Sequence, residues 1–211
     1  SGRFCVIAGG DHETSEQRLI DLANPEAPPR LVAAREEGVQ YSLADRGDEL
    51  FILTNADGAI DFKVVPAPLA APERANWRDL IPYREGVYVL DVELYAGHMV
   101  RLERANALPA IIIRDLESGE EHAIAFDEAA YSLDTMGGYE FETTNLRFSY
   151  SSMTTPAEVY DYDMATRARA LRKRQEIPSG HNPADYVTTR VMATSHEGEQ
   201  VPVSILHLAL I

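Results

Sequence analysis

Short apolar runs with a two-residue period recur along the whole 211-residue chain at a spacing close to 45 residues. One such run in each repeat ends at Leu22, Val65, Leu116 and Met164, which lie 43, 51 and 48 residues apart. Gly, Pro, Asn and Asp separate the runs, and helical periodicity is nearly absent. The pattern therefore predicts an all-β fold built from repeated units.

Each unit has the same order of strands. The run described above is preceded by another, at residues 3–9, 49–55, 98–104 and 145–152. It is followed by a fourth, at residues 29–34, 75–81, 121–126 and 168–175. The last three units also begin with a first strand, at residues 39–44, 88–94 and 129–136. Four antiparallel strands per unit are typical of a β-propeller blade, and the main alternative, a β-sandwich, does not predict one strand order repeated in this way.

The repeat boundaries divide the chain into two parts. We predict a partial β-propeller of about four blades over residues 1–178, with blades at 1–35, 36–82, 86–127 and 129–177. Residues 179–211 begin with a loop rich in Pro, Gly and Asn and continue as two apolar runs around a Glu197-Gly198 turn. This second part is predicted to be a linker followed by a β-hairpin.

Charge and composition exclude several classes of protein. The net charge of −15 argues against nucleic-acid binding, which requires a basic patch. It leaves open whether the acidic surface attracts basic peptides or simply keeps the protein in solution. No run is long enough for a membrane helix, and the first residues do not resemble a signal peptide. The single cysteine, Cys5, excludes an internal disulfide, so we expect a cytoplasmic protein.

The sequence shows no catalytic or metal-binding constellation. The nucleophile motif G-x-S-x-G is absent, so we predict no catalytic residue, no metal and no cofactor, and we assign no substrate-binding residue. The histidines do not have metal-ligand spacing and are expected in loops or at the surface; they are His12, His98, His122, His181, His196 and His207. The acidic string at residues 10–16 could hold a divalent cation, but a solvated turn explains it more simply.

Two further strings have structural explanations. The hydroxyl-rich stretch YSSMTTPAEVYDYDM at residues 150–164 crosses from a second strand to a third, and Pro156, Thr154 and Thr155 favour a turn there. The basic string at residues 167–175 could contact a nucleic acid or form a helix. We expect instead an outermost strand whose charges protect an exposed edge.

Several strings together resemble a known family: the one at 150–164, DHETSEQRLIDL at 11–22, IPYRE at 81–85, IAFDEAAY at 124–131 and EGEQVPVSILH at 197–207. They are similar to the oligopeptidase B (protease II) branch of the prolyl oligopeptidase family. The resemblance implies a seven-bladed propeller that caps a C-terminal α/β-hydrolase domain, which cleaves short peptides after Arg or Lys. The propeller would admit such peptides and exclude folded proteins.

The resemblance assigns no catalytic residue to this sequence. The family's catalytic Ser, Asp and His lie in a part of the hydrolase domain that no position of this sequence matches. The last four residues, 208–211, also depart from the polar continuation it implies. We therefore expect a non-catalytic gating part of a serine oligopeptidase, with the hydrolase domain of the same chain and short basic peptides as partners. The alternative is a free-standing interaction module without peptidase activity.

An incomplete ring of blades leaves two blade faces uncovered. If each exposes about 500 Å² of apolar surface, the cost at about 25 cal/mol per Å² is roughly 25 kcal/mol, which exceeds the ~5–15 kcal/mol stability of a typical domain. Two copies are therefore expected to associate through these faces as a homodimer.

Overall fold

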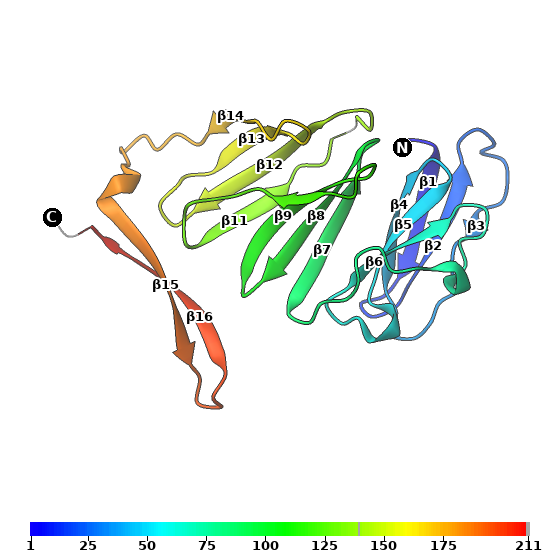
Figure 1. Ribbon diagram of the computed structural model, residues 1–211, viewed down its shortest axis with the longest axis horizontal. Helices are drawn as coiled ribbons and strands as arrows, with labels where there is room; N and C mark the ends of the chain where they lie inside the picture. Colours follow the sequence, from blue (N-terminus) through cyan, green and yellow to red (C-terminus); the bar gives the residue numbers. More distant parts are fainter. Residues whose placement is uncertain (139, 210–211) are drawn as a thin grey trace.

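The computed structural model, which describes residues 1–138 and 140–209, consists of antiparallel sheets that follow one another along the chain (Figure 1). The first two sheets have three strands each and the next two have four. We call them blades 1 to 4 in chain order; a two-stranded hairpin follows blade 4. The blades stand side by side, as expected for consecutive blades of a propeller, so the predicted fold class is confirmed.

Blade 1 contains β1 (Phe4–Gly10), β2 (Ser15–Asp21) and β3 (Arg30–Leu31), and blade 2 contains β4 (Tyr41–Arg46), β5 (Glu49–Thr54) and β6 (Lys63–Pro68). Blade 3 contains β7 (Val87–Leu94), β8 (His98–Ala105), β9 (Leu108–Asp115) and β10 (Glu121–Ala123). Blade 4 contains β11 (Tyr131–Thr135), β12 (Asn145–Ser152), β13 (Glu158–Asp163) and β14 (Arg169–Arg174), and the hairpin contains β15 (Tyr186–Thr194) and β16 (Gln200–Leu208). Short 3₁₀ helices cover Ala56–Gly58, Arg74–Asn76 and Pro183–Asp185. Within the described residues, no helix is long and apolar enough to cross a membrane.

Blade 2 lacks the fourth strand predicted at residues 75–81, and this prediction was wrong. A 3₁₀ helix occupies Arg74–Asn76, and the one β-bridge to β6 joins Val64 to Ile81. The cause lies in β6 itself. Val64 donates its backbone N–H outward to Ile81, at an N–O distance of 3.0 Å. By strand alternation Pro66 and Pro68 face the same way, and proline has no N–H to donate. A continuous ladder therefore cannot form at this edge.

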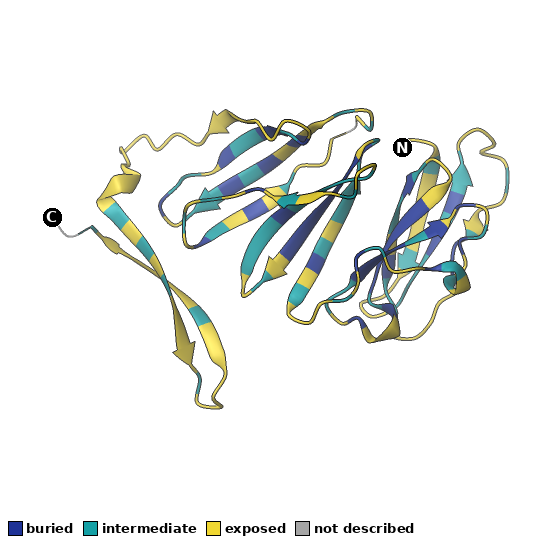
Figure 2. Ribbon diagram, viewed as in Figure 1, coloured by how far each residue is buried: buried dark blue, intermediate teal, exposed yellow. Residues whose placement is uncertain are grey.

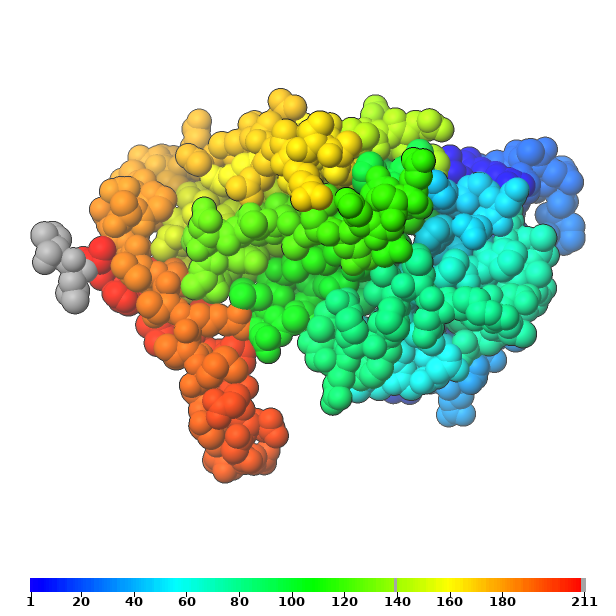
Figure 3. All heavy atoms as spheres, viewed as in Figure 1, coloured from blue at the N-terminus to red at the C-terminus, as the bar shows by residue number. Residues whose placement is uncertain are grey.

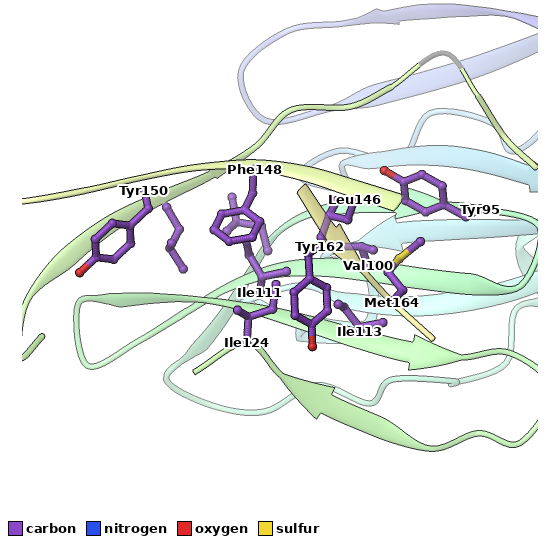
Figure 4. Packing of buried hydrophobic residues seen from close by; sticks show 12 residues of the cluster. Tyr95, Val100, Ile111, Ile113, Ile124, Leu146, Phe148, Tyr150, Tyr162 and Met164 are labelled. Atoms are coloured by element: carbon purple, nitrogen blue, oxygen red, sulfur yellow. The ribbon is translucent and has the colours of Figure 1, made fainter. Parts of the chain in front are cut away.

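The core lies between neighbouring blades rather than within any one of them. Apolar side chains alternate along the strands, so that on β12 Leu146 and Phe148 are fully buried while Arg147 is exposed (Figure 2). Figure 4 shows Phe148 packed with Ile111 and Tyr162 in the cluster between blades 3 and 4. Similar clusters join blades 1 and 2, and blades 2 and 3. Each blade is thus held mainly by its neighbours.

A buried charge network supports blade 3. Arg101 on β8 is 1% exposed, and its guanidinium donates to both carboxylate oxygens of Glu121 at 2.8 and 3.0 Å. It also donates to Glu103 at 2.8 Å. Arg84, from the connection between blades 2 and 3, pairs with the same Glu103 carboxylate. Two carboxylates compensate the buried guanidinium, and removing either one would leave its charge only partly compensated.

Candidate functional site at the hairpin end of the blades

The turns between second and third strands, the connections between blades and the C-terminal hairpin all lie at one end of the blades (Figure 1). In blade 4, for example, β12 ends and β13 begins at this end, and β14 also ends there before the linker. We call this the hairpin end. Two of the strings that carry the family resemblance, at residues 124–131 and 150–164, contact each other through their side chains at this end.

Glu128 is the centre of this arrangement. It belongs to the connection between blades 3 and 4, and its carboxylate accepts hydrogen bonds from the hydroxyls of Tyr150 and Thr154, each at 2.8 Å, and from Thr155. Burial alone would raise the pKa of Glu128, but the hydrogen bonds, including one from Ser152, outweigh it and hold that pKa below its usual range. Glu128 is therefore a fixed negative charge at the hairpin end.

The hydroxyl cluster at residues 151–155 is a turn, as predicted. Ser152 accepts the backbone N–H groups of Thr154 and Thr155 at 3.0 and 2.8 Å through its side-chain oxygen. This leaves the two threonine hydroxyls directed at Glu128. The sequence indicated the turn but not its partner, because Glu128 comes from the preceding blade connection.

The linker after β14 is attached to the same turn. The His181 ring nitrogen Nε2 lies 2.6 Å from the backbone oxygen of Thr154, and the ring stacks on Tyr186 with centroids 5.6 Å apart. Gln175 donates its backbone N–H to Ala157 at 2.8 Å. The turn therefore joins blade 4, the preceding blade connection and the linker in one hydrogen-bonded joint.

The predicted hairpin is present, and it projects from the blades (Figure 3). Gly198 adopts a φ of 92° in its turn, a conformation that glycine tolerates. Val191 pairs with Val203 across the strands, and Ile205 lies on the same face. These side chains are 38–44% exposed. An exposed apolar sheet face of this kind is typical of a surface that packs against further protein.

The acidic string at residues 10–16 forms a turn. Asp11 in the acidic string accepts the backbone N–H groups of Glu13 and Thr14 at 2.9 and 2.8 Å, so its carboxylate stabilises a turn. Within the described residues, no group of three or more His, Cys, Asp or Glu side chains is arranged to hold a metal.

The expectation that every histidine lies in a loop or at the surface was wrong for His98, which is 7% exposed on β8. It shares the buried face of Val100, because the strand alternates.

Consecutive blades with cores between them, followed by a linker and an apolar hairpin, define a β-propeller fold. The chain belongs to the prolyl oligopeptidase family, because the model of that family's N-terminal β-propeller domain matches residues 1–175. The resemblance seen in the sequence is thereby confirmed.

Individual relatives agree with this assignment. The chain is 37% identical to dipeptidyl aminopeptidase BI of Pseudoxanthomonas mexicana over 97% of its own length and 28% of that protein. It is 24% identical to protease 2 of Moraxella lacunata, over 99% of its own length and 29% of the relative's. The structure of oligopeptidase B from Trypanosoma brucei, in a closed form with covalently bound antipain, superposes with a TM-score of 0.91 at 30% identity, covering 100% of this chain and 31% of that one. The chain thus spans less than a third of each of these relatives.

Proposed function

We propose that residues 1–178 are the last blades of a propeller that covers the α/β-hydrolase domain of a longer protein, and that residues 179–211 are the linker and the first strands of that domain. The observation that carries the proposal is the hairpin, whose exposed apolar face follows directly on blade 4. The relatives, which extend far beyond the matched region, support the presence of further protein to cover it.

In this proposal the propeller is not catalytic but controls access to the hydrolase site. Movement between the two domains admits short peptides, and closure excludes water and folded proteins. Cleavage after Arg or Lys is part of the proposal. The trypanosomal oligopeptidase B, a relative of similar fold, holds covalently bound antipain in its closed form. Because Cys5 is the single cysteine and is exposed, a reducing compartment suits the chain, and we propose the cytoplasm.

The joint around Glu128 provides a test of gating in the longer protein. Glu128→Gln removes the charge that holds the Thr154 and Thr155 hydroxyls, and so loosens the attachment of the linker to blade 4. We expect faster cleavage of peptides too long for the wild type, measured on a series of Arg-containing peptides of increasing length. Asp127→Asn is the matched control, because Asp127 is the exposed neighbour.

Two results would contradict the proposal. One is cleavage that does not depend on Arg or Lys, which would remove the assigned specificity. The other is a length limit that is the same in Glu128→Gln, Asp127→Asn and the wild type, which would show that the joint does not control access.

A further inference from the structure

A cleft of about 360 Å³ separates the hairpin from the adjoining ends of blades 3 and 4. Arg190 of β15 enters it from the hairpin, and Ser204 lies directly opposite Arg190 on β16. Its lining on the blades includes three residues with hydroxyl side chains, Tyr131, Ser132 and Ser151. A guanidinium and several hydroxyls are all hydrogen-bond donors, so the cleft is suited to an anion.

Arg190 lacks the partner that other arginines of this region have. Arg147, Arg172 and Arg174 each contact a carboxylate at 2.6–2.7 Å. Arg190 is half-buried, yet it makes no side-chain hydrogen bond or ion pair with any residue in 1–138 or 140–209. A guanidinium that makes no hydrogen bond or ion pair with the described residues keeps its hydrogen-bond donors free for a ligand. In a chain with 34 acidic residues, the absence of one at this position points to an anion supplied from outside the described residues.

The described residues that line the cleft with Arg190 include no carboxylate that would neutralise its charge. Burial raises the pKa of the Tyr131 hydroxyl, and the positive charge of Arg190 acts in the opposite direction, so the two groups lie close enough to interact. The blade end contributes hydroxyls here rather than carboxylates. A ligand in the cleft would therefore meet the positive charge of Arg190, while the Glu128 carboxylate at this end of the blades is occupied by the hydroxyls of Tyr150, Thr154 and Thr155.

We propose that Arg190 and the hydroxyls around it bind the C-terminal carboxylate of a peptide substrate. The inference rests on the proposed peptidase function. A guanidinium can hold a carboxylate through two parallel hydrogen bonds, and the serine hydroxyls can satisfy its remaining lone pairs. Arg190 lies at the junction of the propeller and the proposed hydrolase domain. A peptide can hold its C-terminal carboxylate at Arg190 and its scissile bond at the hydrolase site at the same time only if few residues separate the two. Binding at Arg190 therefore favours short peptides. The site thus acts as a length selector.

The test uses the longer protein that contains this segment and two peptides that differ in one group. One peptide ends in a free carboxylate and the other in an amide. We expect the wild type to cleave the free acid with a kcat/KM about tenfold higher, equivalent to about 1.4 kcal/mol. Arg190→Gln should abolish the difference by lowering kcat/KM for the free acid to that for the amide. Arg190→Lys should retain part of it, because lysine keeps the charge but cannot form the paired bonds.

Lys173→Gln is the control for loss of a positive charge, since Lys173 is exposed on β14 and away from the cleft. Equal cleavage of acid and amide by the wild type overturns the inference. So does a fall in the thermal midpoint of Arg190→Gln without any change in discrimination, because Arg190 would then pair with a carboxylate of the protein itself.

A binding measurement separates this inference from the proposed function. If no peptide is cleaved, the peptidase proposal fails, and titration calorimetry with an N-acetyl dipeptide acid and its amide tests the cleft alone. Tighter binding of the acid that is lost in Arg190→Gln supports the carboxylate site. Equal binding of both compounds overturns it.

Discussion

Asp161 on β13 is a carboxylate held between two arginines. Arg147 donates to its two oxygens at 2.7 and 3.0 Å, and Arg172 donates at 2.7 Å. The hydrogen bond from Arg147 is the largest cause that lowers the pKa of Asp161 to about 2. This triad could not be predicted from a sequence pattern, because its three residues lie on three different strands. Only the pairing register of the strands in blade 4 brings them together.

The depressed pKa of Asp161 predicts a pH dependence of stability. The folded pKa of about 2 lies below the ordinary value of 3.8, so the ionised Asp161 stabilises the folded state above about pH 4. This contribution is lost as the pH falls from about 4 to about 2. Asp161→Asn should therefore show a smaller fall in the urea unfolding midpoint over that range than the wild type.

The control for this experiment is Asp134→Asn, which changes an exposed carboxylate on β11. It should keep the wild-type pH dependence. Parallel curves for Asp161→Asn and the wild type would show that the two arginines do not stabilise the fold through Asp161.

At the scale of the element, packing between blades should carry most of the stability. Phe148 is fully buried at the interface of blades 3 and 4, whereas Ser149 points to the opposite face of β12. We expect Phe148→Ala to lower the free energy of unfolding by about 3–5 kcal/mol through the lost contacts and the remaining cavity. Ser149→Ala should change it by less than about 0.5 kcal/mol. Chemical denaturation followed by Trp77 fluorescence measures both, and equal effects would contradict the assigned faces.

Strand position was predictable where a local period of two decided it, as along β12. It was not predictable at residues 75–81, because the missing ladder depends on prolines in the neighbouring strand β6. The joint at Glu128 and the cleft at Arg190 were missed for a related reason. Each brings together segments that are distant in sequence, and no local signal marks such a meeting.

At the scale of the whole molecule, the uncovered surfaces differ from those assumed in the sequence analysis. The outer face of blade 4 carries the triad of Asp161 with Arg147 and Arg172, so it is charged rather than apolar. The estimate of roughly 25 kcal/mol for two apolar blade faces therefore does not apply to this blade. The most continuous exposed apolar surface on the C-terminal part is the hairpin.

We accordingly expect the isolated chain of 23.4 kDa to associate through its hairpin. Replacing Val191, Val203 and Ile205 with threonine should shift the mass measured by light scattering at micromolar concentration towards the monomer. Val159→Thr on blade 4 is the control and should leave association unchanged. A monomeric wild type would show that the hairpin face is stable in water without a partner.

The prolines of β6 have a consequence for how the protein behaves in a crowded solution. A sheet with a missing outer strand normally presents a row of free donors, which another chain can extend into an aggregate. In blade 2 two of the positions that would offer such donors are Pro66 and Pro68. The same residues that prevent a continuous fourth strand therefore make this edge, which residues 78–81 partly cover, a poor template for a foreign strand. Blade 2 is thus protected from intermolecular strand addition by prolines that lack a backbone donor, together with the short cover of residues 78–81.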